Sequence, residues 1–431
     1  MSSQTNAPAS AADGACSASA VDRALRISVL DGILFALMLG ASESYFGACA
    51  VSLGHGDTAL GLLATLPLFM GAIAQAFTGP LVLWLGSRKR LVAAGAFVQA
   101  ASHLGLIAVA AYSLHSFWLL LGLVLVHYIA GMVIGPAWGA WMGALTENRD
   151  RERYFAMRSA CVSVSTLSAF LWAGYHLRDG VRHNDVSHAY AWIFGVGFVA
   201  RLGSAIMLYR QFDPTPARRD SLRRVMARTR SAVRSDGFRV AILMSVWMAG
   251  AQISIPYYAP YMLKTLGLGY DGYALLCAVQ LLAKTLTLPF IPRLAQLWGL
   301  PRMLAYSMAG AAMVAFIWGA DRSMAGLVAG QVVSGVSWAA YEFSSFQLLL
   351  RRARPRERVE FLASSASLVG LMQLCGSFVG SLLLSRFHLQ YREVFLISSL
   401  ARALPLLAFV PAKTRQTRGA STLVQPRETI P

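Results

Sequence analysis

Four ionisable residues lie deep inside long apolar runs, where a charge is expensive to maintain. They are Glu43, His127, Lys284 and Glu342. A side chain of this kind in hydrocarbon must pair with another group, face a water-filled space or reach back to a helix end. These residues are therefore candidates for binding a solute or relaying a proton across a membrane.

Two candidates lie in the first half of the chain. Glu43 has Gly40 and Gly47 on its helical face, which leaves room beside the carboxyl group. Such an acid can take up and release a proton as its access to water alternates, although it could also merely touch an outer vestibule. His127 lies midway along its apolar run, and histidine titrates near physiological pH. It is either a relay or ligand contact, or a hydrogen-bonded packing residue.

The other two lie in the second half. Lys284 has Gln280 and Thr287 on its face, and this polar stripe predicts an inward orientation. Lys284 would bind an anionic substrate group or form an ion pair with an acid. Glu342 shares a face with Trp338 and lies in the last third of its run. For Glu342, an interaction with basic loop residues that closes a gate is an alternative to ligand contact.

An interrupted helix is predicted between these pairs. Gln252 and Tyr258 surround Pro256, and Pro260 follows. Prolines make this segment a candidate moving element with an amide and aromatic rings as ligand contacts. A belt of interfacial aromatic residues explains the tyrosines equally well.

Three further charged residues are expected to reach water instead. Asp31 lies one turn inside the first run, and Arg201 and Arg402 lie about two turns from the ends of theirs. Because long side chains can snorkel to the interface, we leave both arginines out of the predicted site.

The elements that carry these residues are membrane spans. Hydrophobic residues make up 56% of the chain and charged residues only 13%, which is typical of a polytopic membrane protein. A net charge of +18 would suit a nucleic-acid-binding protein, but the arginines lie in short loops between apolar runs. We therefore expect no nucleic acid partner.

Apolar runs long enough to cross a bilayer recur along the chain and predict about twelve helices. Their approximate ranges are 28–52, 59–85, 91–112, 117–145, 156–176, 189–209, 240–263, 272–294, 303–320, 325–350, 362–384 and 394–410.

A strongly basic segment, 210–239, separates the first six runs from the last six. Arginines gather here and in alternate loops, which places these loops and both termini in the cytoplasm by the positive-inside rule. The segment could also bind anionic lipid. Arginine outnumbers lysine and no targeting segment precedes the first span, so we expect a bacterial cytoplasmic membrane protein.

The two halves repeat each other at an offset close to 200 residues. Trp138 and the basic loop that follows it are echoed by Trp338 and its loop, and Arg201 by Arg402. Two six-helix pseudo-repeats with a cytoplasmic linker are typical of transporters that rock two bundles about a central site. The expected organisation is a disordered cytoplasmic tail at 1–26, an N-terminal bundle at 27–210, a basic linker at 211–238, a C-terminal bundle at 239–412 and a cytoplasmic tail at 413–431.

With these features the chain resembles the major facilitator superfamily of transporters, as a bacterial branch with a degenerate loop between the second and third spans. The family's loop motif is matched at Gly79, Gly86 and Arg88, whereas Leu83 and Trp84 replace its usual Asp-Arg pair. The resemblance implies a gating role for the three matched residues.

We therefore predict a secondary active transporter that works by alternating access. Proton coupling and export of an amphiphilic compound are favoured. The alternatives are an uptake permease for a small polar metabolite, and a membrane sensor or scaffold that transports nothing. We expect no enzymatic activity, cofactor or metal, since no phosphate-binding loop or metal-ligand spacing occurs, and we expect a monomer.

Overall fold

The computed structural model describes residues 9–147, 149–214, 220–268 and 270–409. Within these ranges every regular element is a helix, which confirms the predicted all-α class. The predicted tail at 413–431 lies outside the described residues. Helix α1 begins at Ala9, so the structure differs from the disordered tail expected at 1–26.

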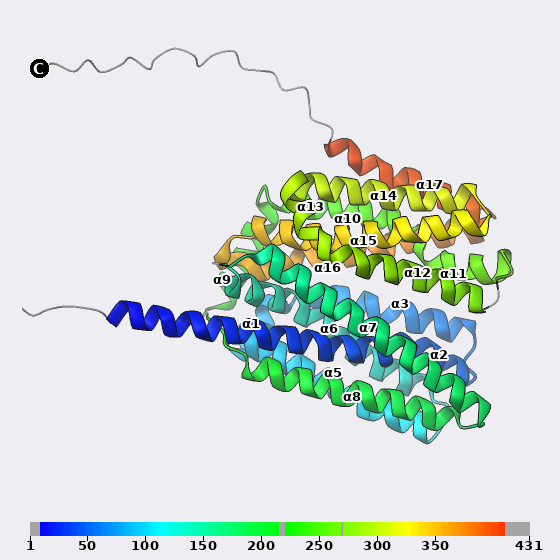
Figure 1. The fold of residues 1–431 in the computed structure, drawn as a ribbon, viewed down its shortest axis with the longest axis horizontal. Coiled ribbons are helices and arrows are strands. Elements are labelled where there is room, and N and C mark those ends of the chain that lie inside the picture. The colour runs from blue at the N-terminus through cyan, green and yellow to red at the C-terminus, as the bar shows by residue number, and fades with distance from the viewer. Residues whose placement is uncertain (1–8, 148, 215–219, 269, 410–431) are drawn as a thin grey trace, which may run out of the picture.

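The N-terminal half forms one bundle, drawn in the lower part of Figure 1. Its helices are α1 (Ala9–Ala41) with η1 (Glu43–Tyr45) and α2 (Phe46–Ser52), α3 (Asp57–Gln75), α4 (Thr78–Leu85), α5 (Arg88–Ala111), α6 (Phe117–Leu145), α7 (Arg151–Arg182) and α8 (Val186–Arg210).

The C-terminal half forms the second bundle. Its helices are α10 (Phe238–Gln252) with η2 (Ile255–Tyr257), α11 (Tyr258–Pro260) and η3 (Tyr261–Thr265), α12 (Tyr270–Thr287) with η4 (Leu288–Phe290) and α13 (Ile291–Trp298), α14 (Leu300–Ala320), α15 (Met324–Arg352), η5 (Pro355–Glu357), α16 (Arg358–Ser385), and α17 (Tyr391–Ala403) with η6 (Leu404–Phe409).

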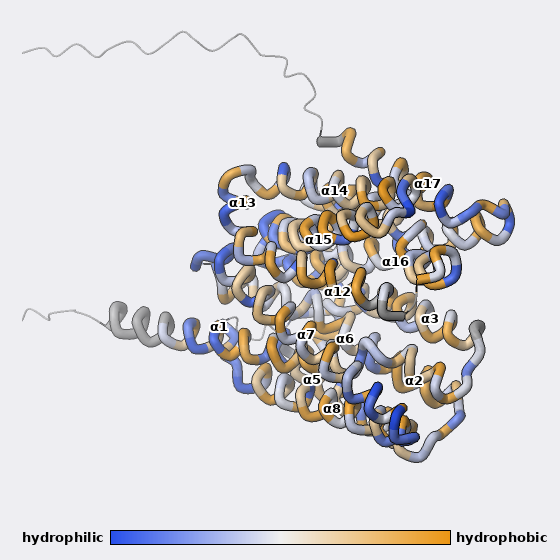
Figure 2. The backbone as a smooth tube through the Cα atoms, turned by 45° about the vertical axis from the view of Figure 1, so that its right-hand side comes forward, coloured by the Kyte–Doolittle hydropathy of each residue, from blue (hydrophilic) through white to orange (hydrophobic). Residues whose placement is uncertain are grey.

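Helices therefore occupy all twelve predicted spans. Within the described residues, nine helices are long and apolar enough to cross a membrane, and the bent pair α3–α4 makes a tenth. The remaining two are α15, which is interrupted by polar residues such as Gln331 and Ser334, and the short α17. Hydrophobic segments run along the long helices in Figure 2, with hydrophilic ones at their ends.

Local sequence explains the main breaks. Pro80 lacks the N–H that would bond to Ala76, and α3 and α4 meet at this point with a bend of 64°. Gly86 ends α4 with a positive φ of 77°, which a side chain would disfavour. Ser87 then caps α5 by accepting a hydrogen bond from the backbone N–H of Arg90. Pro256 and Pro260 coincide with the interrupted helix predicted after α10.

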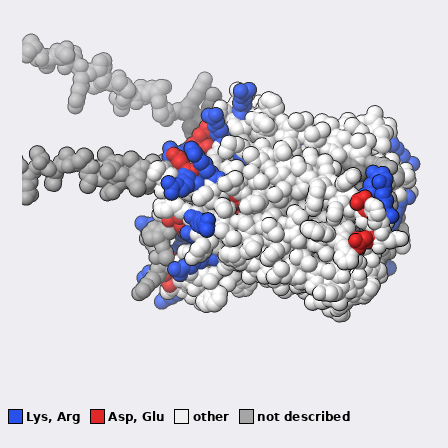
Figure 3. Space-filling view, turned by 60° about the horizontal axis from the view of Figure 1, so that its bottom comes forward, with Lys and Arg blue, Asp and Glu red and all other residues white. Residues whose placement is uncertain are grey.

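The basic segment 211–238 contains a helix of its own, α9 (Leu222–Arg234), at one end of the bundle. We call this end the linker end. Charged side chains gather at the linker end and at the opposite end, with a broad uncharged band between them in Figure 3. This distribution is what a membrane-spanning protein requires.

The apolar core shows how the two halves meet. One cluster of buried residues joins them near the linker end, where Trp141 and Leu145 of the first half share it with Leu350 and Phe361 of the second. Two further clusters, around Phe194 and Trp318, each belong to one half alone and lie toward the opposite end. The halves are thus packed together at the linker end and separate beyond it.

Candidate functional site

Each half contains a cavity lined by polar side chains. The first-half cavity has a volume of about 370 Å³ and the second-half cavity about 450 Å³. A smaller cavity of about 160 Å³ lies between them and shares Arg158 and Trp138 with the first, and Lys284 and Glu342 with the second. The three cavities bring the polar groups of both halves to one central region.

Glu43 and His127, predicted separately, contact each other in the first-half cavity. The Oε2 atom of Glu43 lies 3.1 Å from Nε2 of His127. The His127 side chain is fully buried, whereas that of Glu43 is 17% exposed. The kink at η1 places Glu43 beside α6, and its carboxyl group is the water-accessible member of the pair.

Gln99 of α5 connects this pair to the rest of the network. Its Nε2 donates to the carbonyl oxygen of His127 at 3.1 Å, and its Oε1 accepts from Nε of Arg201 at 2.9 Å. Arg201 also donates to Ser204 at 2.7 Å, and Ser204 donates to Oδ1 of Asp31 at 2.6 Å. A continuous polar path therefore runs from Glu43 to Asp31.

Asp31 lies where the first-half network approaches the second half. Its Oδ2 is 3.5 Å from a guanidinium nitrogen of Arg158, which also stands over the Trp138 ring at 4.4 Å from the centroid. Asp31 is 3% exposed. The expectation that it reaches water was wrong, because α7 and α8 cover it with two arginines.

Lys284 and Glu342 form an ion pair between α12 and α15, with Nζ 2.7 Å from Oε1. The Glu342 side chain is 55% exposed, so it faces the space between the halves. The same two helices are joined by Gln280, whose Nε2 donates to Ser334 at 2.9 Å. Of the polar stripe predicted around Lys284, Gln280 and Lys284 line the second-half cavity, whereas Thr287 donates to the carbonyl oxygen of Ala283 in its own helix.

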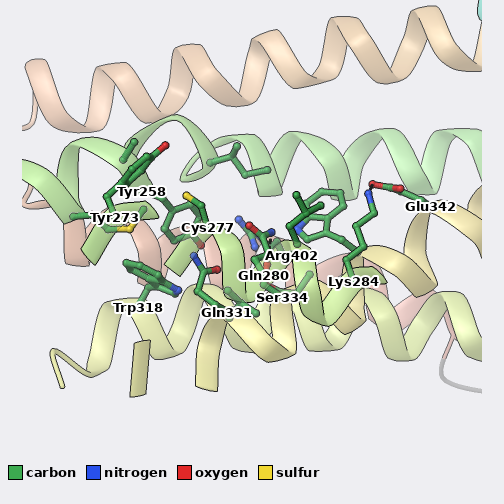
Figure 4. Close-up of a pocket in the computed structure, with 17 residues that line it drawn as sticks. Tyr258, Tyr273, Cys277, Gln280, Lys284, Trp318, Gln331, Ser334, Glu342 and Arg402 are labelled. Carbon is green, nitrogen blue, oxygen red and sulfur yellow. Dashed lines mark hydrogen bonds and ion pairs between the residues drawn. The ribbon is translucent and has the colours of Figure 1, made fainter. Parts of the chain in front are cut away.

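Aromatic rings line the other end of the second-half cavity (Figure 4). Tyr258 stacks on Phe395 at a centroid distance of 4.8 Å and meets the edge of Trp318 at 5.1 Å. Gln252 lines neither cavity. Its predicted ligand contact is not supported, because the lining residues of this segment follow the helix break and begin at Ile255.

Arg402 of α17 lies between the aromatic rings and the Lys284–Glu342 pair in Figure 4. It is 2% exposed, and Arg201 is 3% exposed. Snorkelling was therefore the wrong interpretation of both arginines. Arg201 and Arg402 occupy matching positions of the repeat, and this was the sequence signal that could have placed them in the site. A charged residue that recurs at the same buried position in both halves indicates a common structural role.

The three residues of the loop motif line another cavity, of about 410 Å³, at the linker end. Arg88 donates to the carbonyl oxygen of Ala140 at 3.0 Å and lies 3.8 Å from Asp213 of the linker. Gly79 lies under α9, and a Cβ atom there would be 3.1 Å from Val225. Gly86 forms the turn between α4 and α5.

Ion pairs of the linker hold this region together. Arg228 of α9 contacts Asp220 at 2.7 Å and Glu360 of α16 at 2.8 Å. Burial opposes its charge, but the hydrogen bonds and charges of these two acids raise the pKa of Arg228. A separate ion pair, between Glu152 of α7 and Arg351 of α15, links the halves directly.

Among the described residues no group of three His, Cys, Asp or Glu side chains could hold a metal ion. The polar network is built instead from single acids, each facing one or two basic or amide groups. Such an arrangement can move protons and bind a solute, but it offers no ligand set for a metal.

Comparisons with known proteins agree with this architecture. Residues 32–270 match the family model of the Major Facilitator Superfamily. The proton:xylose symporter XylE has a similar structure, with a TM-score of 0.70 and 14% identity over 91% of this chain and 96% of that one. A search of curated proteins gave no match.

Two more solved structures are similar at the same low identity. The E. coli fucose:proton symporter FucP has a TM-score of 0.71 and 14% identity over 89% of this chain and 97% of that one. The human organic anion transporter MFSD10 has a TM-score of 0.69 and 14% identity over 90% and 98%. At this identity the likeness concerns the fold.

Proposed function

The chain belongs to the Major Facilitator Superfamily, and we propose that this secondary transporter moves a small organic solute by alternating access in exchange for, or together with, protons. The observation that carries the coupling is the 3.1 Å contact between Glu43 and His127 on the wall of a buried cavity. Only the Glu43 side chain of this pair reaches the water-accessible space.

The contact suits proton exchange. A proton taken up by Glu43 from water can pass to Nε2 of His127, whose ring is fixed by Gln99 and by Ser102 at 3.4 Å from Nδ1. The path through Arg201 and Ser204 then connects this event to Asp31 and Arg158. The charge state of Glu43 would thus bias contacts near the interface between the halves.

We propose that the linker end faces the cytoplasm of a bacterium, with both termini on that side. The excess of arginine in α9 and the neighbouring loops supports this orientation. Because the halves pack together at the linker end and separate at the other, the structure then corresponds to an outward-facing state.

Gly79, Gly86 and Arg88 would act at the cytoplasmic gate. The family's usual acid is replaced by Leu83, and Asp213 of the linker lies near Arg88 instead. Opening this gate would separate α4 from α16. Because α9 contacts both helices, it must leave one of them, and leaving α16 would break the contact between Arg228 and Glu360. The linker would therefore take part in gating.

α9 also supports binding of anionic lipid. Leu222, Met226 and Val233 are exposed on this helix among arginines such as Arg223 and Arg230. An apolar stripe flanked by basic residues is typical of a helix that lies in the membrane interface. We propose this contact for a monomeric transporter.

Export of an amphiphilic compound is our first choice. The aromatic residues that line one end of the second-half cavity support an amphiphilic solute. Uptake of a small polar metabolite is the second candidate, supported by Lys284, Glu342 and Gln280 at the other end. A sensor or scaffold on the same fold would leave the buried Glu43–His127 contact without a role.

Transport by purified protein in proteoliposomes tests the proposal. An imposed pH gradient should drive flux of at least one compound from a panel of labelled metabolites and dyes. Glu43→Gln should abolish this flux while preserving exchange of substrate, and Asp179→Asn, at an exposed acid of the same half, should behave as wild type. Identical responses of wild type and Glu43→Gln to the gradient would contradict the coupling role. Absence of any flux would favour the sensor or scaffold.

A further inference from the structure

Arg402 is a buried charge that no described carboxylate neutralises. Its guanidinium donates to the carbonyl oxygens of Ala311 at 2.7 Å and Ala251 at 2.9 Å, and to Ser254 at 2.6 Å. All three acceptors are neutral. Its Nε atom is buried without a hydrogen-bond partner.

The matching arginine of the first half lies in a group whose charges balance. Arg201 reaches Asp31 through Ser204, Arg158 pairs with Asp31, and Glu43 supplies the second acid of the same cavity. The described acids of the second-half cavity offer no equivalent, since Glu342 is engaged by Lys284 at 2.7 Å. Arg402, Lys284 and Glu342 together leave the second-half cavity with a net positive charge.

A positive charge in this position is costly without a counter-ion. Arg402 is 2% exposed, and a charge withdrawn from water loses several kilocalories of hydration unless a partner compensates it. Neutral carbonyl and hydroxyl groups supply hydrogen bonds but no opposite charge. Arg402 lines an open cavity of about 450 Å³, so the compensating charge can come from a ligand.

The surroundings indicate what kind of anion would fit. Tyr258, Tyr273 and Trp318 line the cavity at one end, and Gln280 and Gln331 lie near Arg402 (Figure 4). The volume is in the range of small-molecule sites. Aromatic walls favour an apolar ring, and a guanidinium favours a carboxylate because a charge-assisted hydrogen bond can form between them.

We propose that the second-half cavity binds an aromatic organic anion, with its carboxylate at Arg402 and its ring among the tyrosines and Trp318. This inference rests on the proposed function, since it names the substrate class of that transporter. Lys284 contributes to the positive field of the cavity, and Glu342 limits that contribution through the ion pair.

The test compares charged probes with neutral counterparts of the same shape. Binding to the purified full-length protein would be measured by thermal shift and calorimetry at fixed ionic strength. The probes are benzoate, phenylacetate and indole-3-acetate, each with its amide. We expect at least one acid to bind and raise the melting temperature, and its amide to do neither.

Three variants locate the effect. Arg402→Gln should weaken binding of the acid by at least about 30-fold, because it removes one member of a buried charge pair. Arg402→Lys should weaken binding less, since the charge is retained. Arg386→Gln removes the same charge at an exposed position directly after α16 and should bind as wild type.

The inference is overturned if no acid binds better than its amide, or if Arg402→Gln binds the acid as tightly as wild type does. These outcomes are distinct from failure of the proposed function. If the wild-type protein binds the acid but its transport does not respond to a pH gradient, the anion site is supported and proton coupling is contradicted. If a pH gradient drives flux of neutral compounds but not of any acid, proton coupling is supported and the anion site is contradicted.

Discussion

The two halves bury an arginine at the same point of their repeat and treat its charge differently. In the first half, Arg201 belongs to a network that contains the acids Asp31 and Glu43. In the second half, the hydrogen bonds that Arg402 makes to described residues all go to neutral groups, and it lines a larger cavity. Under the two proposals above, the halves kept one scaffold and specialised, the first for proton exchange and the second for a solute.

Removing the two arginines is the strongest test of this comparison. Arg201→Gln leaves Asp31 with less compensation and breaks a buried network, so we expect a loss of about 3 kcal/mol of unfolding free energy. Arg402→Gln removes a charge without a counter-ion, and we expect a loss below about 1 kcal/mol without ligand. Chemical denaturation of both variants in the same detergent measures the difference. Equal losses would show that the two charges are equally compensated.

The next effect concerns the acids. Glu43→Gln should reduce gradient-driven flux by about 100-fold or more, as expected for loss of a proton-transferring group. Glu342→Gln leaves Glu43 and His127 in place, so the pH dependence of transport should survive, with altered substrate affinity. Flux measured over a range of pH separates the two variants. A lost pH dependence in Glu342→Gln would place coupling in the second half as well.

Alanine substitutions at two glycines in matching positions of the repeat should differ in their stability cost, by a smaller amount than the arginine variants do. A Cβ at Gly335 would lie 2.3 Å from the carbonyl oxygen of Gln280, in the backbone of α12, whereas one at Gly131 would meet the side chain of Gln99 at 2.6 Å. Gly335→Ala should therefore cost about 1–3 kcal/mol of stability. Gly131→Ala should cost less, because a side chain can move.

Gly131→Ala should instead disturb function. Displacement of Gln99 alters the group that fixes His127, so the variant should lose part of its gradient-driven flux while keeping a melting temperature close to that of wild type. Thermal denaturation and flux of both glycine variants, measured side by side, check this pattern. A more destabilised Gly131→Ala would contradict the difference between the halves.

The smallest expected effect is at the linker, which joins the halves. Arg228→Gln breaks the contacts with Asp220 and Glu360, and a partly exposed ion pair of this kind contributes about 1 kcal/mol or less. The cytoplasmic gate should open more often, detected as greater labelling of a cysteine introduced at Leu83, which lines the cavity at the linker end. Raising the salt concentration should produce a similar change in wild type. Unchanged labelling would remove the linker from the gate.

Local sequence was sufficient for the spans and for several site residues. Apolar length located twelve helices, including α15 despite its polar residues, because spans of about twenty residues leave a strong compositional signal. Four ionisable residues could also be identified, because a charge within such a span is costly and is usually functional. They are Glu43, His127, Lys284 and Glu342. Membership of the family followed from the same pattern and was confirmed by the match over residues 32–270.

Tertiary structure alone decided the partnerships. Glu43 meets His127 across 84 positions of sequence, and Lys284 meets Glu342 across 58, distances over which no local pattern specifies a contact. Arg201 and Arg402 were misplaced because position along a helix gives depth but not what surrounds it. Whether a charge is neutralised, and whether two halves meet at one end or the other, depends on which helices pack together, and that is a property of the folded chain.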